Sequence, residues 1–473
     1  MRAMKRDLQA LATEHFDVLI IGGGILGAGI ARDATLRGLR VALIDKGDFA
    51  GGTSSRTSKL IHGGFRYLEQ RAFGLVAESC RERRILRELA PERVRPQPFL
   101  LPVYEGNRHS LGMMRLGMTL YDLLARYQNV ASHQTLTAAR ALQQEPTLEP
   151  RGLRGAILFY DCQEDDARFC LDNTLHAAEL GTVCANYCEL TGFDAGNGRI
   201  RSARVNDKLT GNSFEIVARS FVNATGPWIE RVAGLVGQSF ALSPTKGVHL
   251  VLPRLTEKGI FFQSKTDGRM MFIVPFGDCS LVGTTDTDFS GNPDDVHASP
   301  ADVEYLLREL TGLLPARKID VITTYAGVRP LLRAAGRTPS ARSREHRLAQ
   351  AGANLISVAG GKYTTYRAIA AEVVDAVYGL LGNKPVRCRT AETPIPCRPP
   401  VRADDIAYFC ENEMAMTVTD VMRRRTPLAL SRQGGPEMAE RVAKAMAMAL
   451  GWNDEQMRRS LQEYVDEWKR NLP

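Results

Sequence analysis

The chain has 473 residues, 44% of them hydrophobic and 24% charged, which is the composition of a folded globular protein with room for about three domains. Its 61 lysines and arginines exceed its 53 aspartates and glutamates, and the net charge of +8 suits an anionic substrate or an anionic membrane surface. The basic residues are spread along the chain and only 7% of residues are aromatic, which argues against a dedicated nucleic-acid-binding protein.

The nine cysteines are odd in number and include no Cys-x-x-Cys pair. We therefore expect reduced thiols in a cytoplasmic protein, with neither a disulfide framework nor a metal site. No apolar run approaches the length of about 18 residues that a transmembrane helix needs, so none is predicted. The first 16 residues lack the apolar core of a secretory signal.

A nucleotide-binding unit is predicted near the start of the chain. Residues 16–21 are apolar and mostly β-branched, which is typical of a buried parallel strand. A Gly22-x-Gly24-x-x-Gly27 turn, a helix over 28–38 and a second strand over 40–44 follow, and that strand ends at Asp45. Glycines let the backbone approach a pyrophosphate at the helix N-terminus, and the acidic residue can bind ribose hydroxyls. NAD and FAD both fit this pattern.

Three later segments favour a flavin. Ala224-Thr225-Gly226 follows an apolar strand, and Gly360-Gly361-Lys362 separates the last strand from a helix whose N-terminus can approach a reduced flavin. Hydroxyl-rich residues 53–59 lie just beyond Asp45.

The remaining pattern predicts alternating helices and strands. We expect helices over 75–92, 111–127, 163–181 and 300–314, and one that follows Gly360-Gly361 and runs to about residue 381. Strands are expected over 183–193, 199–207, 213–218, 247–252, 258–264, 270–275, 279–284 and 355–358. Pro91, Pro96, Pro98 and Pro102 predict a loop-rich crossing. A proline-rich stretch after Pro385 indicates a linker, and the pattern beyond Asp404 predicts a helical region.

Six segments resemble the FAD-dependent glycerol-3-phosphate dehydrogenase family: Thr53-Ser-Ser55, Ser58-Lys-Leu-Ile-His-Gly-Gly-Phe-Arg-Tyr67, Asn223-Ala-Thr-Gly-Pro-Trp228, Gly283-Thr-Thr-Asp286, Gly327-Val-Arg-Pro330 and Gly360-Gly-Lys-Tyr-Thr-Thr-Tyr-Arg367. The resemblance implies an α/β fold with a glutathione-reductase-like, Rossmann-type FAD domain, an antiparallel β-sheet substrate cap and a C-terminal helical domain. We expect an N-terminal segment (1–15), an FAD domain (16–390) with an inserted cap (about 95–165 and 240–325), and a helical domain (391–473).

The resemblance and the residue chemistry together give a set of cofactor residues. We expect non-covalent FAD to be held by Gly22, Gly24, Gly27, Asp45, Thr53, Ser54, Ser55, Ser58, Lys59, Leu60, Ala224, Thr225, Gly226, Gly361, Lys362 and Thr364.

A phosphate dianion needs several charge-assisted donors. Arg66, Arg329, Lys362 and Arg367 each lie within a few residues of a glycine turn and are the expected clamp, with Tyr67 and Thr365 as hydroxyl donors. Alcohol oxidation also needs a base, and His249 and His62 are the candidates. We expect His249, with an ordinary pKa of about 6.5, to remove the proton, while Arg329 orients the substrate and His62 positions flavin or substrate.

The family oxidises sn-glycerol 3-phosphate to dihydroxyacetone phosphate, with hydride transfer to flavin N5 and electrons passed to membrane quinone, or to oxygen in the oxidase branch. Another small phosphorylated or phosphonate alcohol, or a hydroxy or amino acid, stays open as substrate. The C-terminal domain is shorter than in the longest members, and Ala326 stands where many have Ser.

The resemblance further implies a cytoplasmic protein on the cytoplasmic face of the inner membrane, with peripheral contact to anionic lipid, a possible homodimer and no nucleic-acid partner. Residues 1–6 together with Leu8 and Leu11 form a basic amphipathic segment that is the expected lipid contact, and the Met- and Arg-rich C-terminal helices are the alternative contact.

Overall fold

The computed structural model describes residues 3–69, 71–315, 319–333, 346–397 and 405–473. Its first sheet contains five parallel strands in the order β18 (Leu355–Gly360), β10 (Ser213–Asn223), β1 (His15–Ile21), β2 (Val41–Ile44) and β7 (Val183–Ala185). Strand β17 (His346–Ala351) joins antiparallel to β18 at the edge. Residues 18–21 of β1 and all of β2 are buried, because helices and a second layer of strands cover the sheet.

Each face of this sheet has its own apolar core. Helices α2 (Ile25–Leu36), α6 (Asp166–Glu179) and α9 (Tyr366–Leu380) pack together on one face. On the other face lie β8 (Cys188–Gly196) and β9 (Arg199–Asp207), an antiparallel pair that continues into β10, with α1 (Leu8–Thr13) and α7 (Ile229–Gly234). The parallel strands thus form the middle of three layers.

The second sheet forms the cap. Its main path is β15 (Thr287–Asp288), β11 (Thr245–Pro253), β14 (Cys279–Gly283), β13 (Met270–Phe276), β12 (Gly259–Gln263), β4 (Arg95–Tyr104), β6 (Leu153–Gln163) and β3 (Leu60–Ile61), with β16 (Thr323–Arg329) on β11 and β5 (Gln134–Thr137) on β6. The described pairings are antiparallel except β4 with β12. Most of its strands lie within the two predicted cap segments, whereas β3 precedes them and β16 runs past the end of the second.

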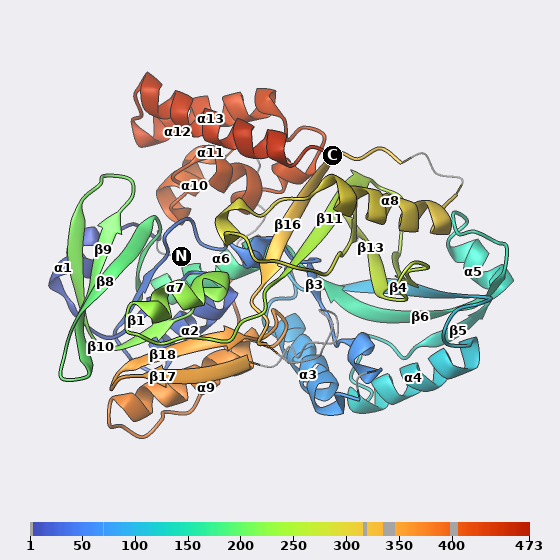
Figure 1. Cartoon of the computed structure of the whole chain (residues 1–473), viewed down its shortest axis with the longest axis horizontal. Helices are drawn as coiled ribbons and strands as arrows, with labels where there is room; N and C mark the ends of the chain where they lie inside the picture. The colour runs from blue at the N-terminus through green and yellow to red at the C-terminus, as the bar shows by residue number, and fades with distance from the viewer. Residues whose placement is uncertain (1–2, 70, 316–318, 334–345, 398–404) are drawn as a thin grey trace.

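Side chains alternate between the two faces of the cap sheet. Leu100 and Leu250 face α5 (Ala138–Gln144) and α8 (Pro300–Leu313), whereas Leu101 and Val251 face α3 (Phe73–Leu89) and α4 (Leu111–Leu124). Figure 1 shows α8 above this sheet and α3 and α4 below it.

The predicted loop at Pro96, Pro98 and Pro102 is wrong, because these residues belong to β4, which pairs along its length with β6. The three prolines alternate in register, so their missing N–H groups lie on the same side of the strand. That arrangement leaves the other side free to hydrogen-bond to β6.

Other strand boundaries also differ from the predictions. Residues 183–193 divide into β7 and β8, and the strand predicted at 213–218 continues to Asn223 as one strand. Strand β10 pairs with β9 through its first half and with β1 through its second, so its hydrophobic pattern changes along its length. Strands β6, β16 and β17 were not predicted from the sequence.

Helices α10 (Ile406–Glu413), α11 (Val418–Asp420), α12 (Pro436–Leu450) and α13 (Asp454–Arg470) form the predicted helical C-terminal region. They share a core of their own and lie along the upper edge of the molecule in Figure 1. A π-helical turn at Val421–Arg425 directs Arg424 and Arg425 onto Asp48 of the first domain. Buried charge therefore joins the two regions.

The N-terminal segment is not available as the expected lipid contact. Leu11 is fully buried in the core of the first domain, and Met4 is buried beside Glu413. Arg6 pairs with Asp207 at 2.5 Å. Across the described ranges, no helix is both long and apolar enough to cross a membrane.

Candidate functional site

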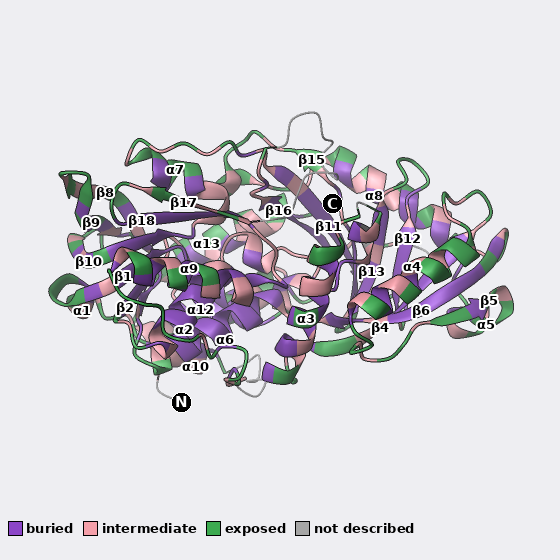
Figure 2. Cartoon of the chain, turned by 90° about the horizontal axis from the view of Figure 1, so that it is seen from below, coloured by how far each residue is buried: buried purple, intermediate pink, exposed green. Residues whose placement is uncertain are grey.

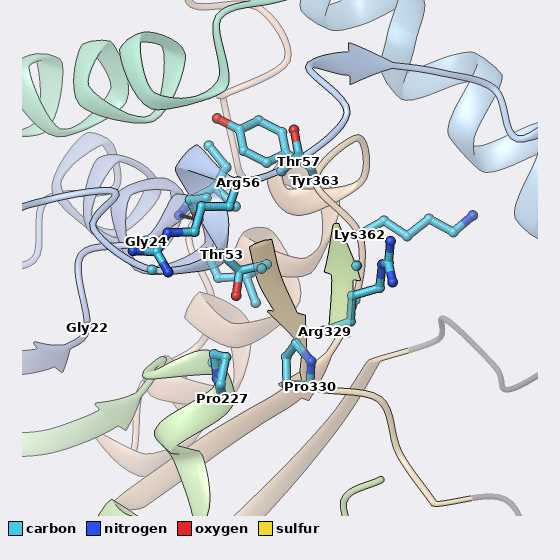
Figure 3. A pocket seen from close by; sticks show the side chains of 18 of the residues that line it. Gly22, Gly24, Thr53, Arg56, Thr57, Pro227, Arg329, Pro330, Lys362 and Tyr363 are labelled. Atoms are coloured by element: carbon cyan, nitrogen blue, oxygen red, sulfur yellow. Dashed lines mark hydrogen bonds between the residues drawn. The ribbon is translucent and has the colours of Figure 1, made fainter. Parts of the chain in front are cut away.

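A cavity of about 770 Å³ runs between the parallel sheet and the cap. Figure 3 shows Gly22 and Gly24 on one side of it and Arg329 and Lys362 on the other. Its volume is within the range of about 300–1,000 Å³ found for small-molecule and cofactor sites. The ends of β1, β2 and β10 open into it, which is where doubly wound sheets bind ligands.

The glycine turn after β1 makes room for a ligand. Gly22 has a φ of +105°, and a Cβ there would lie 2.7 Å from the carbonyl oxygen of Ala224. A Cβ on Gly27 would lie 1.8 Å from the carbonyl oxygen of Gly22, so only glycine lets α2 start so close to the strand. Gly24 is the N-cap of α2 and brings no side chain to the helix N-terminus, an arrangement that favours an anionic group.

Asp45 follows β2 at the same edge of the sheet. Its carboxylate accepts hydrogen bonds from the backbone N–H groups of Gly23 at 2.6 Å and Gly47 at 2.8 Å. Burial raises its pKa to about 6, against the lowering effect of these two bonds. It stays an ionised acceptor at pH 7, as ribose hydroxyls require.

These residues fit a dinucleotide. Thirteen of the sixteen expected FAD residues line the cavity: Gly22, Gly24, Asp45, Thr53, Ser54, Ser58, Leu60, Ala224, Thr225, Gly226, Gly361, Lys362 and Thr364. Gly27 is not among the lining residues, but its missing side chain allows the close approach of α2 to β1. Ser55 hydrogen-bonds back to Gly52, and Lys59 is buried in an ion pair with Asp166, so neither side chain reaches the cavity.

Arg329 and Lys362 supply positive charge at the far end of the cavity. The Arg329 guanidinium donates to Oγ1 of Thr284 at 3.0 Å and to Asp286 at 3.1 Å. A Cβ on Gly247 would lie 2.3 Å from that guanidinium, so the glycine in β11 provides its space. Lys362 has its ammonium 3.7 Å from the centroid of the Tyr67 ring and 3.3 Å from the Ser79 hydroxyl.

His249 lies on β11, which pairs with the strand β16 that carries Arg329, and 3% of its surface is exposed. Its ring stacks on Tyr325 with centroids 4.8 Å apart, and its Nε2 is 2.9 Å from the Ser58 hydroxyl. Nδ1 has no hydrogen-bond partner among the described residues, although a buried imidazole nitrogen normally has one.

The pKa expected for His249 is wrong. Burial first, and then the positive charges of Arg329 and Lys59, lower its pKa from 6.5 to about 3. With this pKa the ring is neutral at pH 7. The sequence could not show this, because Lys59 and Arg329 are far from His249 along the chain.

Two expected substrate residues, Arg367 and Thr365, are not among the described residues that line the cavity. Arg367 points to α3, where it makes a bidentate ion pair with the buried Glu82 at 2.7 Å for both bonds. Thr365 is the buried N-cap residue of α9. The side chain of Arg66 lies outside the described residues. His62 and Tyr67 do line the cavity, and the backbone N–H of His62 donates to the Thr364 hydroxyl at 3.2 Å.

Several lining residues were missed by sequence reasoning. An apolar wall consists of Phe65, Phe159, Phe261, Met270 and Phe272. All but Phe65 lie on cap strands, where they have the pattern of an ordinary core, so no local signal distinguishes them. Arg269 also lines the cavity and is bound to Asp267 at 2.8 Å.

The nucleotide end has a further missed contact. Lys46 lies 4.2 Å from the centroid of the Trp228 ring and binds both carboxylate oxygens of Asp294, at 2.7 and 2.8 Å. All three residues line the cavity. The contact joins the end of β2 to the cap loop between β14 and α8.

Comparisons with known proteins agree with this geometry. Residues 17–375 match the model of the FAD dependent oxidoreductase family, and residues 364–457 match that of the C-terminal domain of alpha-glycerophosphate oxidase. The chain is 33% identical to a glycerol-3-phosphate dehydrogenase of Synechocystis sp., over 98% of both chains. It is 34% identical to glycerol-3-phosphate dehydrogenase 2 of Mycobacterium tuberculosis, over 96% of this chain and 88% of the relative.

A solved structure is similar over the whole length. The glycerol-3-phosphate dehydrogenase from Bacillus halodurans, complexed with FAD, superposes with a TM-score of 0.82 at 27% identity and covers 100% of this chain and 98% of its own. The sequence prediction of family, fold and cofactor is thereby confirmed. The chain is an FAD-dependent oxidoreductase and belongs to the glycerol-3-phosphate dehydrogenase/oxidase family.

Proposed function

We propose that the protein oxidises sn-glycerol 3-phosphate to dihydroxyacetone phosphate and passes the electrons to membrane quinone. The observation that carries the substrate assignment is that one cavity is lined by Arg329, Lys362 and His249, whose Nδ1 has no hydrogen-bond partner among the described residues. Two cations suit a phosphate dianion better than a single carboxylate, and a free imidazole nitrogen suits a hydroxyl beside it.

In this proposal Arg329 and Lys362 hold the phosphate. Thr284 and Asp286 fix the guanidinium, and the Tyr67 ring lies against the ammonium, so both cations are oriented before substrate arrives. Tyr67 and His62 complete the wall around the carbon chain. Non-covalent FAD, held at the glycine turn and Asp45, supplies the two-electron acceptor for the hydride that leaves C2.

His249 has the role of binding the C2 hydroxyl and receiving its proton. The neutral ring accepts a hydrogen bond from the hydroxyl through Nδ1 while Ser58 fixes Nε2. Arg329 and Lys59 oppose a charged ring, but the phosphate dianion offsets the charge of Arg329 when substrate is present. Proton transfer to His249 thus becomes favourable only with a phosphorylated substrate in place.

The electron acceptor defines the second candidate function. The family includes an oxygen-using branch, and the matched C-terminal model is that of an oxidase. We favour quinone because the apolar wall that includes Phe65 and Phe272 offers a lipophilic acceptor an apolar surface in the cavity. Peripheral attachment on the cytoplasmic face of the inner membrane follows from that choice.

The test is an anaerobic titration of the purified yellow protein. Glycerol 3-phosphate should bleach the flavin absorbance, whereas glycerol, glycine and lactate should not. Bleaching by an amino or hydroxy acid alone would contradict the substrate assignment. Reoxidation is then compared with a soluble ubiquinone analogue and with oxygen, and stoichiometric peroxide without quinone reduction would show the oxidase instead.

A further inference from the structure

A second cavity, of about 180 Å³, lies at the junction of the first domain, the cap and the C-terminal helices. The backbone N–H of Thr324 donates to the carbonyl oxygen of Asn471 at 2.7 Å, which holds the end of the C-terminal region against β16. Figure 1 and Figure 2 both place the C-terminal end of the chain beside β11 and β16. The arginines that line this second cavity come from segments far apart in the sequence: Arg56, Arg423 and Arg470.

Two of these arginines share one carboxylate. Nη2 of Arg56 lies 3.7 Å, and Nε of Arg423 3.1 Å, from the same oxygen of Glu467. Arg470, at the end of α13, forms no ion pair with a described residue. Burial lowers the pKa of Arg56, and the positive charges of Arg423 and Arg424 lower it further. Several positive charges are therefore held close together around a single negative one, which is electrostatically costly at a partly buried site.

The other acidic residues of the second cavity do not balance this charge. Asp294 binds Lys46 through both of its carboxylate oxygens, at 2.7 and 2.8 Å. Asp295 is exposed, where water screens its charge, and it accepts a hydrogen bond from the Asn292 amide at 3.2 Å. The excess of positive charge is left to solvent or to a bound anion.

The size and chemistry of the second cavity select the anion. Its volume is below the range of about 300–1,000 Å³ typical of cofactor and drug-sized ligand sites, so it suits a compact ion and not a nucleotide. Guanidinium groups match the oxygens of a phosphate in pairs, and a dianion offsets more positive charge than a carboxylate does. We propose that Arg56, Arg423 and Arg470 bind a phosphate group in this cavity, at a site separate from the one that holds the substrate.

The second cavity is next to the site of the reaction. Arg56 lines both cavities, so an anion bound to it changes the charge at their common wall. Tyr325 lines the second cavity and stacks on His249, with ring centroids 4.8 Å apart. Because the three arginines belong to the first domain and to the C-terminal helices, a phosphate between them also joins these two regions.

The experiment is equilibrium dialysis of the FAD-loaded protein against radiolabelled inorganic phosphate at constant ionic strength. It uses the Arg329→Ala variant, in which the proposed substrate clamp is weakened. Adding Arg423→Gln and Arg470→Gln to this variant should weaken phosphate binding by at least about tenfold, because each charge-assisted pair is strong. Arg458→Gln is the matched control and should change nothing, since Arg458 is exposed on the same helix and does not line the cavity.

Competition identifies the anion. Glycerol 3-phosphate should displace the label if the site accepts phosphate monoesters, and its failure to do so would assign the site to inorganic phosphate. Acetate at the same ionic strength should displace little. Displacement by acetate as readily as by unlabelled phosphate would overturn the proposal, because the arginines would then attract any anion.

Thermal unfolding gives a second measurement. Phosphate should raise the Tm of the Arg329→Ala variant above its value in chloride at the same ionic strength, and this rise should vanish with Arg423→Gln and Arg470→Gln. Arg470→Gln alone removes a side chain that is exposed and unpaired within the described ranges, so it should fold normally and still weaken binding. Phosphate affinity that is equal with and without Arg470 and Arg423 would refute the site. Phosphate binding that Arg329→Ala leaves as strong as in wild type would count against the substrate clamp alone.

Discussion

The Ser58 hydroxyl lies 2.9 Å from Nε2 of His249, whereas Nδ1 of the same ring has no hydrogen-bond partner among the described residues. Replacing His249 by Gln should leave FAD bound but slow flavin reduction by about a hundredfold, within the usual contribution of a positioned acid–base group. Stopped-flow absorbance after anaerobic mixing with glycerol 3-phosphate measures this rate. An unchanged rate would remove His249 from the chemistry.

A second variant separates the ring's position from its proton chemistry. Ser58→Ala removes the partner of Nε2 but leaves the stack on Tyr325, so reduction should slow by about tenfold and not more. A loss in Ser58→Ala as large as that in His249→Gln would mean that Ser58 acts in the chemistry itself.

Arg329 should discriminate between phosphorylated and unphosphorylated substrates. Its guanidinium is fixed by Thr284 and Asp286, so Arg329→Ala should lower kcat/KM for glycerol 3-phosphate by at least tenfold, the factor that about 1.4 kcal/mol represents. The much slower oxidation of glycerol should change far less. Arg201→Ala, an exposed arginine on β9, is the control and should change neither. Equal losses on both substrates would assign Arg329 a role other than phosphate binding.

The sequence predicted those parts of the site that are encoded locally. The unit from β1 through Gly22 and Gly24 to Asp45 occupies about thirty consecutive residues. Its glycines let the backbone and the N-terminus of α2 come close to a ligand. Arg329 and Lys362 were found because each follows a glycine-containing family motif. Their roles remain predictions.

Long-range packing decided what could not be predicted. Arg367 has the same motif context as Lys362, yet its direction depends on Glu82, which is buried on α3 285 residues away in sequence. The prolines of β4 indicate a loop until the position of β6 shows which side of the strand must hydrogen-bond. The low pKa of His249 likewise depends on charges brought from two other segments.

Asp48 should be essential for attaching the C-terminal helices. Its fully buried carboxylate lies 2.5 Å from Nε of Arg424 and binds Arg425 through both oxygens, and the two guanidinium groups lower its pKa. Asp48→Asn leaves two buried arginines without their shared counter-charge, which should reduce the free energy of unfolding by about 3–5 kcal/mol. Urea denaturation followed by circular dichroism measures the loss. Asp194→Asn, in the exposed Asp194–Arg201 pair, should leave stability unchanged.

FAD binding should depend on the ionisation of Asp45. Burial raises the pKa of Asp45 to about 6 in the protein without ligand, and only the ionised carboxylate can accept bonds from both ribose hydroxyls. The dissociation constant for FAD should therefore be constant above pH 7 and rise as the pH falls through 6, by at most about tenfold per pH unit for one proton. Flavin fluorescence quenching by apoprotein measures it.

Asp45→Asn supplies the control for this pH dependence. The amide cannot ionise, so binding should be weaker at pH 7 and nearly flat between pH 7 and pH 5. A wild-type curve that is equally flat would show that Asp45 stays ionised down to acidic pH and that burial does not control its pKa.

The Lys46–Asp294 ion pair should slow the release of FAD, because it crosses from the nucleotide-binding sheet to the cap loop at the cavity wall. Lys46→Met keeps the side-chain length and the contact with Trp228 but removes the charge. The pair is partly exposed and contributes no more than about 1 kcal/mol, so FAD should dissociate at most about fivefold faster. Recovery of flavin fluorescence after dilution gives the rate.

Three controls test whether the two residues act as a pair. Asp294→Asn should raise the dissociation rate of FAD as much as Lys46→Met, and the double variant should raise it no further. In 1 M salt the dissociation rate of wild type should approach that of the variants. Additive effects of the two substitutions would show that the residues act separately and that no bridge retains the cofactor.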